Sequence, residues 1–292
     1  MKKNKGNLAL LAVILAAVVG GALPVYVKIG LKQISPFSFT LLRFVLASLF
    51  FIPLLSRKNK ISFKSFLEIG LISLLSTANI ILFSFGIKLT AASIGQMLYA
   101  GVPIIVALLS FFMLKEKIFG RKFFGIVLGF IGTVMVVVLP LLSKNSPLSG
   151  NLIGNLMVFV GVFFYSLYGI YSKKIQKKYS PVQLTAVFSI TTALVVLFPA
   201  VGEIVSGNHW WIGLTEQTIF SLFYVGLLGT AIYYLLYQYA IKNGTPIIAS
   251  MTLYLQPVMT IVWASILLGE KISAGFILAT IMVLLGAYLT TR

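Results

Sequence analysis

Two stretches of this sequence decide its fold: residues 87–118, IKLTAASIGQMLYAGVPIIVALLSFFMLKEKI, and residues 241–272, IKNGTPIIASMTLYLQPVMTIVWASILLGEKI. A shift of 154 residues aligns them without a gap, and it pairs Pro103 with Pro257 and Glu116 with Glu270. The same shift pairs Ile87 with Ile241, Lys88 with Lys242, Met97 with Met251, Leu114 with Leu268, Lys117 with Lys271, Ile118 with Ile272 and Gly132 with Gly286. Self-similarity of this kind indicates an internal repeat.

The parts of the chain that precede these stretches are also similar to each other. A shift of 145 residues matches Tyr26, Lys28, Lys32, Ser35 and Pro36 to Tyr171, Lys173, Lys177, Ser180 and Pro181. The sequence therefore predicts two copies of one unit, at residues 1–144 and 145–292.

The composition requires a lipid environment. Of 292 residues, 59% are hydrophobic and only 10% are charged, with a mean hydropathy of +1.05, so the chain has too little polar surface to cover a water-soluble globule. The net charge of +18 lies in short runs between apolar stretches, and a nucleic-acid-binding protein would gather it on one polar face. The chain has no cysteine, which excludes disulfides and thiolate chemistry.

Ten apolar runs are long enough to cross a bilayer, which requires about 20 residues per helix. The basic N-terminus and first run resemble a signal peptide, but the run continues to about Gly30, so we interpret it as an uncleaved span. The predicted spans are Asn7 to Val27, Pro36 to Leu55, Phe66 to Ile87, Ala92 to Leu114, Phe123 to Leu142, Asn151 to Ser172, Pro181 to Val201, Ile219 to Ile241, Pro246 to Leu268 and Ala274 to Leu289. The fold class is therefore all-α and integral to the membrane, with ten transmembrane helices.

The positions of Lys and Arg predict the orientation of the chain. If the N-terminus is cytoplasmic, 17 of the 23 basic residues lie on the cytoplasmic side and five lie outside. Both termini are then cytoplasmic. Because each repeat contains five helices, an odd number, the second copy has the opposite orientation in the membrane. Inverted repeats of this kind are typical of transporters that work by alternating access around a central site.

Residues 20–53, GGALPVYVKIGLKQISPFSFTLLRFVLASLFFIP, and residues 227–273, LLGTAIYYLLYQYAIKNGTPIIASMTLYLQPVMTIVWASILLGEKIS, carry a resemblance to a known family. The chain resembles the EamA-type branch of the drug/metabolite transporter superfamily over essentially its whole length. The resemblance implies a ten-helix secondary transporter that exports amino acids or related metabolites, with helices 5 and 10 peripheral to a central cavity. Two positions depart from the family pattern: Gly20 replaces a common tryptophan, and Gln256 replaces a common glutamate.

Arg43 is the one formally charged side chain deep within a predicted span. A charge at the bilayer centre costs about 2.5 kcal/mol or more, so Arg43 is expected to face the bundle interior and to have a partner there. Two hypotheses remain open. Arg43 either attracts the carboxylate of a substrate, or it binds backbone carbonyls at a broken helix and holds the fold together.

Proline and glycine residues predict where the spans bend. Pro103 and Pro257 are expected to kink the fourth and ninth helices, shaping the cavity and serving as hinges, or to be kinks tolerated for packing. Gly20, Gly21 and Pro24 form a third predicted flexible point in the first helix.

Polar and aromatic side chains within the apolar spans complete the predicted site, although any single tyrosine could instead serve packing or lie at the membrane interface. The predicted substrate-binding residues are Arg43, Asn79, Gln96, Tyr99, Tyr165, Tyr168, Tyr234, Gln238 and Tyr254. Together they predict an aromatic-lined pocket suited to an amino acid or a small apolar metabolite.

The sequence contains no Asp, and its single histidine, His209, lies in a predicted external loop. We therefore expect uniport or exchange without a carboxylate proton relay, and no catalytic activity, metal or cofactor. Glu116 and Glu270 are expected to cap the helices that follow them. The expected partners are a small-molecule substrate and the lipid bilayer of a bacterial or archaeal inner membrane, and nothing in the sequence indicates an oligomeric state. A translocase of a lipid, a lipid-linked sugar or a nucleotide sugar remains an alternative on the same architecture.

Overall fold

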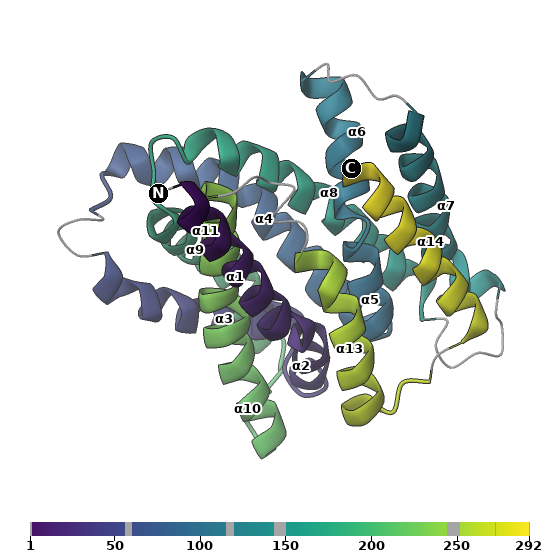
Figure 1. Ribbon diagram of the computed structural model, residues 1–292. Helices are drawn as coiled ribbons and strands as arrows, with labels where there is room; N and C mark the ends of the chain where they lie inside the picture. Colours follow the sequence, from purple (N-terminus) through teal and green to yellow (C-terminus); the bar gives the residue numbers. More distant parts are fainter. Residues whose placement is uncertain are drawn as a thin grey trace.

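The computed structural model describes residues 2–55, 60–114, 120–142, 150–243, 252–271 and 273–291. Every regular element in these ranges is a helix (Figure 1). The helices are α1 (Lys2–Gly21), α2 (Leu23–Gly30), α3 (Pro36–Phe51), η1 (Ile52–Leu54), α4 (Phe63–Leu89), α5 (Ala92–Tyr99), α6 (Val102–Leu114), α7 (Gly120–Leu142), α8 (Leu152–Ile175), α9 (Pro181–Val205), α10 (Glu216–Phe223), η3 (Tyr224–Ile232), α11 (Tyr233–Asn243), α13 (Thr252–Leu268) and α14 (Ala274–Thr291).

The distribution of polar and apolar side chains is that of a membrane protein. Eight helical segments in the described part of the chain are long and apolar enough to cross a membrane, and they coincide with the first eight predicted spans. Two shorter apolar helices, Gln256–Leu268 and Ala274–Thr290, lie in the ninth and tenth. Large apolar side chains such as Phe198 are exposed, whereas Arg43 is fully buried. The protein is thus a multi-pass membrane protein; the total of ten spans and the cytoplasmic location of both termini remain predictions.

In the first and fourth spans the α-helix is divided by a turn of one or two residues, and the backbone at Ala22 and Ala100 stays in the right-handed helical region. The first is interrupted at Ala22, between α1 and α2, and the fourth at Ala100 and Gly101, between α5 and α6. Pro103 is the second residue of α6, where the missing N–H of proline removes no helical hydrogen bond. The interruption therefore lies just before Pro103, and not within a helix that continues around it as the sequence predicted. Pro257, by contrast, does lie inside α13.

The eighth span contains a π-helical segment that the sequence did not predict. The span consists of α10, the π-helix η3 and α11 in direct succession. Within η3 the hydroxyl of Thr230 donates a hydrogen bond of 2.6 Å to the carbonyl oxygen of Val225, five residues earlier. Segments of this kind are rare and occur frequently at functional sites.

The two halves of the chain pack mainly against each other. The third span, α4, contacts the sixth, α8, and the equivalent contact joins the eighth span, at α11, to the first, at α1. The pairs α3 with α9 and α7 with α14 join equivalent spans of the two halves. A twofold pseudo-symmetry that relates the two halves converts the α4–α8 contact into the α11–α1 contact. It leaves the α3–α9 and α7–α14 contacts unchanged. In Figure 1 the pair α7 and α14 lies at one side of the molecule, away from α1, α3 and α11.

The contact between α7 and α14 is close because both helices present glycine. A Cβ atom added at Gly286 would lie 2.3 Å from the Cα and the backbone nitrogen of Gly129. No side chain fits in this space, so the two backbones are in direct contact, as in other membrane helices that associate through small residues.

Candidate transport site

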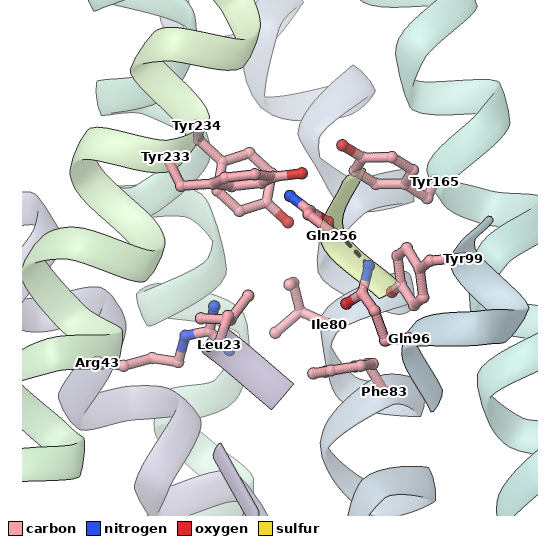
Figure 2. Close-up of a pocket in the computed structure, with 10 residues that line it drawn as sticks. All are labelled: Leu23, Arg43, Ile80, Phe83, Gln96, Tyr99, Tyr165, Tyr233, Tyr234 and Gln256. Carbon is pink, nitrogen blue, oxygen red and sulfur yellow. Dashed lines mark hydrogen bonds between the residues drawn. The ribbon is translucent and has the colours of Figure 1, made fainter. Parts of the chain in front are cut away.

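A small pocket lies where α2, α3, α4, α5, α8, α11 and α13 converge (Figure 2). Both halves of the chain contribute to it, whereas α7 and α14 do not. It is lined by Leu23, Arg43, Ile80, Phe83, Gln96, Tyr99, Tyr165, Tyr233, Tyr234 and Gln256. The lining is therefore mainly aromatic and apolar, with one cation and two amides.

Arg43 has only part of its hydrogen-bonding capacity used. It projects from α3 with no exposed surface, and its Nε donates a hydrogen bond of 3.0 Å to the hydroxyl of Thr230 in η3. Its Nη1 and Nη2 atoms are buried and have no hydrogen-bond partner in the described part of the chain. Figure 2 shows the guanidinium group directed toward the pocket interior. A buried cation with two unused donor groups favours an anion beside it, because unpaired buried charge is costly.

Two glutamine side chains connect the halves across the pocket. The Nε2 atom of Gln96, on α5, donates to the Oε1 atom of Gln256, on α13, at 2.8 Å (Figure 2). Gln256 extends over α1 at Gly20, where an added Cβ would lie 2.1 Å from its Nε2 atom. Gly20 thus provides the space that Gln256 occupies. The two positions that depart from the family pattern therefore contact each other.

The aromatic wall is formed by rings from both halves. The ring centroids of Tyr99 and Tyr165 are 5.6 Å apart, and those of Tyr233 and Tyr234 are 5.3 Å apart. Asn79 lies behind this wall, where its amide donates to the hydroxyl of Tyr99 at 2.5 Å and to the carbonyl oxygen of Gly161 at 2.8 Å. Asn79 therefore orients a pocket tyrosine and does not itself line the pocket.

The structure brings five of the predicted binding residues into the pocket lining: Arg43, Gln96, Tyr99, Tyr165 and Tyr234. Tyr168 and Gln238 form a neighbouring buried pair, with the Gln238 amide donating to the Tyr168 hydroxyl at 3.0 Å. The side chain of Tyr254 lies outside the described part of the chain. The other lining residues, which are not among the nine predicted binding residues, are Leu23, Ile80, Phe83, Tyr233 and Gln256.

The free space in the pocket is too small for a metabolite in this conformation. Its volume is about 30 Å³, far below the roughly 300–1,000 Å³ of small-molecule sites. Any larger ligand requires the lining side chains or their helices to move apart.

None of the described acidic residues lines the pocket. Glu68 accepts hydrogen bonds from Lys178 and Tyr179, and Glu216 lies in the first turn of α10. Glu203 accepts from the backbone N–H groups of Phe37 and Ser38 and from the hydroxyls of Ser35 and Ser38. It therefore caps the N-terminus of α3.

Glu270 caps α5. Its carboxylate accepts from the backbone N–H of Ala92 at 2.7 Å, and from the N–H and hydroxyl of Ser93 at 3.1 and 2.5 Å. The prediction that Glu270 caps the helix that follows it is thus wrong, because the carboxylate turns to a helix of the other half. These three hydrogen bonds are called the Glu270 cap below. Glu116 lies outside the described residues.

A second, larger cavity lies beside the Glu270 cap. Its volume is about 490 Å³. Its lining is Lys28, Lys32, Leu89, Thr90, Ala91, Gly150, Leu268, Gly269, Glu270 and Lys271. By the predicted orientation it opens on the external side, and it is called the outer cavity below.

Three helices connect the outer cavity and the central pocket. α2, α5 and α13 contact one another, and each has one end near the central pocket and the other near the outer cavity. Where these helices pack together, Val25, Ile29, Ala92 and Ala264 form a buried apolar cluster, which is called the apolar layer below. Two of these helices, α2 and α5, are only eight residues long and are bounded by the interruptions at Ala22 and Ala100.

The chain is similar to known proteins over nearly its whole length. A family model described as the EamA-like transporter family matches the chain twice, at residues 7–138 and 152–292. An uncharacterized transporter of Archaeoglobus fulgidus is 28% identical over 272 residues, which cover 91% of this chain and 91% of that protein. The uncharacterized transporter YoaV of Bacillus subtilis is 26% identical, over 97% of this chain and 96% of that protein.

A solved crystal structure has the same fold. It aligns with 96% of this chain and 95% of its own chain at a TM-score of 0.68, with 16% sequence identity. Similarity at this level of identity concerns the fold alone.

Proposed function

The chain belongs to the EamA-like transporter family, and from that premise we propose that it is a secondary transporter that exports a small metabolite, an amino acid, across the inner membrane of a bacterial or archaeal cell. The observation that carries this proposal is Arg43, whose Nη1 and Nη2 atoms are buried without a partner at the pocket. A guanidinium group binds a carboxylate through two parallel hydrogen bonds. Arg43 is therefore proposed to bind the carboxylate common to all amino acids.

The rest of the pocket suits the other groups of an amino acid. Tyrosine rings bind cations over their faces, and the amide oxygens of Gln96 and Gln256 accept hydrogen bonds. Both kinds of group can hold an ammonium group without a carboxylate. Leu23, Ile80 and Phe83 supply an apolar surface for a side chain.

Alternating access is supported by the interrupted helices. The apolar layer closes the central pocket toward the outer cavity, and α2 and α5 carry much of this layer. Because both are short and separated from α1 and α6, they can tilt while the longer helices stay in place. We propose that the inverse movement opens the opposite side, as the repeat predicts.

Uniport or exchange is the proposed mode of transport. A proton relay in a membrane ordinarily uses buried carboxylates or histidine. None of the described acidic residues lines the central pocket, and the sequence has no Asp. We therefore expect the substrate gradient alone to drive transport.

The proposal is tested by counterflow in proteoliposomes with a panel of amino acids and their carboxamide analogues. We expect the wild-type protein to prefer an amino acid over its amide, and Arg43→Gln to raise the apparent KM for the acid about tenfold or more while leaving that for the amide unchanged. The ratio of acid to amide within one variant does not depend on how much protein folds. An unchanged ratio in Arg43→Gln would leave Arg43 with a structural role only.

The same vesicles test the mode of transport. Counterflow is expected to proceed without a proton or sodium gradient, and an absolute requirement for either gradient would contradict uniport and exchange. The alternative of a lipid or sugar-nucleotide translocase calls for a basic lateral opening, and Arg43 is the one basic residue in the pocket lining.

A further inference from the structure

We propose that the outer cavity is a second binding site, in which Lys28, Lys32 and Lys271 hold the carboxylate of a small organic anion. The cavity of about 490 Å³ is in the size range of small-molecule sites, unlike the central pocket in this conformation. The inference that the outer cavity lies on the export route rests on the proposed function. The inference that it binds an organic anion does not.

The charge of the outer cavity is the first argument. Only five lysines are predicted on the external side, and three of them line this one cavity. Membrane proteins tend to place basic residues on the cytoplasmic side, and this chain follows that tendency strongly. Three lysines at one external cavity are therefore an exception to this tendency. Binding of an anionic ligand would explain why they lie there.

Glu270 is the single acidic residue that lines the cavity, and its carboxylate is bonded to α5 and not to the lysines. Both carboxylate oxygens of Glu270 are directed to α5, where Ala92 and Ser93 donate three hydrogen bonds to them. No ion pair joins Glu270 to a lysine in the described part of the chain. The three ammonium groups and one carboxylate leave the cavity with a net positive charge.

Lys28 is a fixed part of the cavity wall. It is half-buried, and its ammonium group donates a hydrogen bond to the carbonyl oxygen of Thr90, at the C-terminal end of α4. An ammonium group has three donors, so Lys28 keeps others for a ligand. Lys32 and Lys271 are exposed at the cavity, so a ligand can reach their ammonium groups.

The position of the cavity connects it to Arg43. α2, α5 and α13 extend from one site to the other, and the apolar layer separates them. When the layer opens, a carboxylate that leaves Arg43 meets the three lysines next. The proposed substrate chemistry is thus the same at both sites.

Succinate is a suitable probe of the outer cavity, and its binding to the purified protein in a neutral detergent can be measured by isothermal titration calorimetry. We expect Lys32→Gln combined with Lys271→Gln to weaken binding about tenfold, because it removes two of the three positive charges that line the cavity. The pair Lys32→Arg and Lys271→Arg keeps both charges and should bind like the wild type. Added salt should weaken binding in the wild type.

One further variant distinguishes binding in the outer cavity from binding elsewhere on the protein. Lys88→Gln removes an exposed lysine at the end of α4 that does not line the cavity, and it should leave binding unchanged. Equal loss of binding in Lys88→Gln and in the double glutamine variant, unchanged binding in the double glutamine variant, or no binding to the wild type would each overturn the proposal. Succinate binding without any amino-acid counterflow would keep the outer site and reject the proposed function.

Discussion

A single hydroxyl group sets the direction of the Arg43 guanidinium. Thr230 donates its own hydrogen to Val225, so its oxygen is free to accept from the Nε atom of Arg43. This leaves the two Nη atoms on the side of the pocket. Thr230 is therefore a positioning residue for Arg43, and under the proposed function it acts on the substrate through that side chain.

Thr230→Val tests this role because valine keeps the shape of threonine without the hydroxyl. We expect the apparent KM for the transported amino acid to rise about tenfold with little change in kcat, because a hydrogen bond to a charged group contributes roughly 1.5–3 kcal/mol. Thr230→Ser should restore most of the affinity. Thr192→Val removes a buried hydroxyl that is hydrogen-bonded to Thr77 at 2.8 Å, and it serves as the matched control. If Thr230→Val and Thr192→Val changed KM equally, Thr230 would have a packing role only.

The sequence predicts Arg43 as a site residue but not its partner. A lone arginine in an apolar span is conspicuous by composition, whereas Thr230 is one of many hydroxyl residues and contacts Arg43 across 187 positions. Its geometry also depends on the π-helix, which has no clear sequence signal. Gln256 departs from a family pattern, yet its place in the pocket follows from Gly20, 236 residues away in the chain.

At the scale of elements, the short helices α2 and α5 are the parts most suited to move. α5 carries Gln96 and Tyr99 of the central pocket at one end and the Glu270 cap at the other. The first N–H groups of a helix have no partner within the helix, and the helix N-terminus attracts negative charge. At the start of α5 the carboxylate of Glu270 accepts hydrogen bonds from these groups. Glycine and proline predicted bends at Gly20, Gly21, Pro24, Pro103 and Pro257; turns lie near the first four, whereas Pro257 lies inside α13. The acceptor of the α5 N–H groups lies 178 residues away and follows only from the tertiary fold.

Weakening the Glu270 cap is expected to open the central pocket toward the outer cavity. Because the chain has no cysteine, Ile80→Cys places a unique thiol in the pocket lining. Adding Glu270→Gln should increase the rate at which a membrane-impermeant maleimide labels this thiol from outside, by about tenfold for a loss of about 1.4 kcal/mol. Glu216→Gln is the control, since Glu216 is exposed in the first turn of α10 and lines neither space. A labelling rate that does not change would show that the cap does not hold the layer closed.

The glycine contact of α7 and α14 gives a prediction about stability. Gly286→Ala places a methyl group 2.3 Å from the backbone of Gly129, so the helices must separate. Overpacking of this kind costs about 1–3 kcal/mol, and we expect a fall in the apparent Tm of the protein in detergent. Gly202→Ala is the matched control, because an added Cβ there meets nothing within 4 Å. The Gly286 variant should still bind substrate below its Tm, because neither helix lines the pocket.

On the scale of the whole molecule, the repeat and the membrane character could be predicted from sequence. Both follow from local signals, namely apolar run lengths and the pairing of residues such as Pro103 with Pro257. The arrangement of the pocket could not be predicted in full, because Leu23, Ile80 and Phe83 are apolar residues in apolar spans and carry no distinguishing signal. The pairing of helices between halves likewise depends on packing, which hydropathy does not encode.

This pairing has a consequence for biosynthesis. A ribosome delivers the helices to the membrane in order, yet α3, α4 and α7 of the first half find their main partners in α9, α8 and α14 of the second. The early helices must therefore wait in the bilayer, with Arg43 and the glycine face of α7 uncovered, until the later ones emerge. α14 is the last of the described helices to arrive, and it covers α7. The nascent chain therefore completes this part of its interior only after α14 has entered the bilayer.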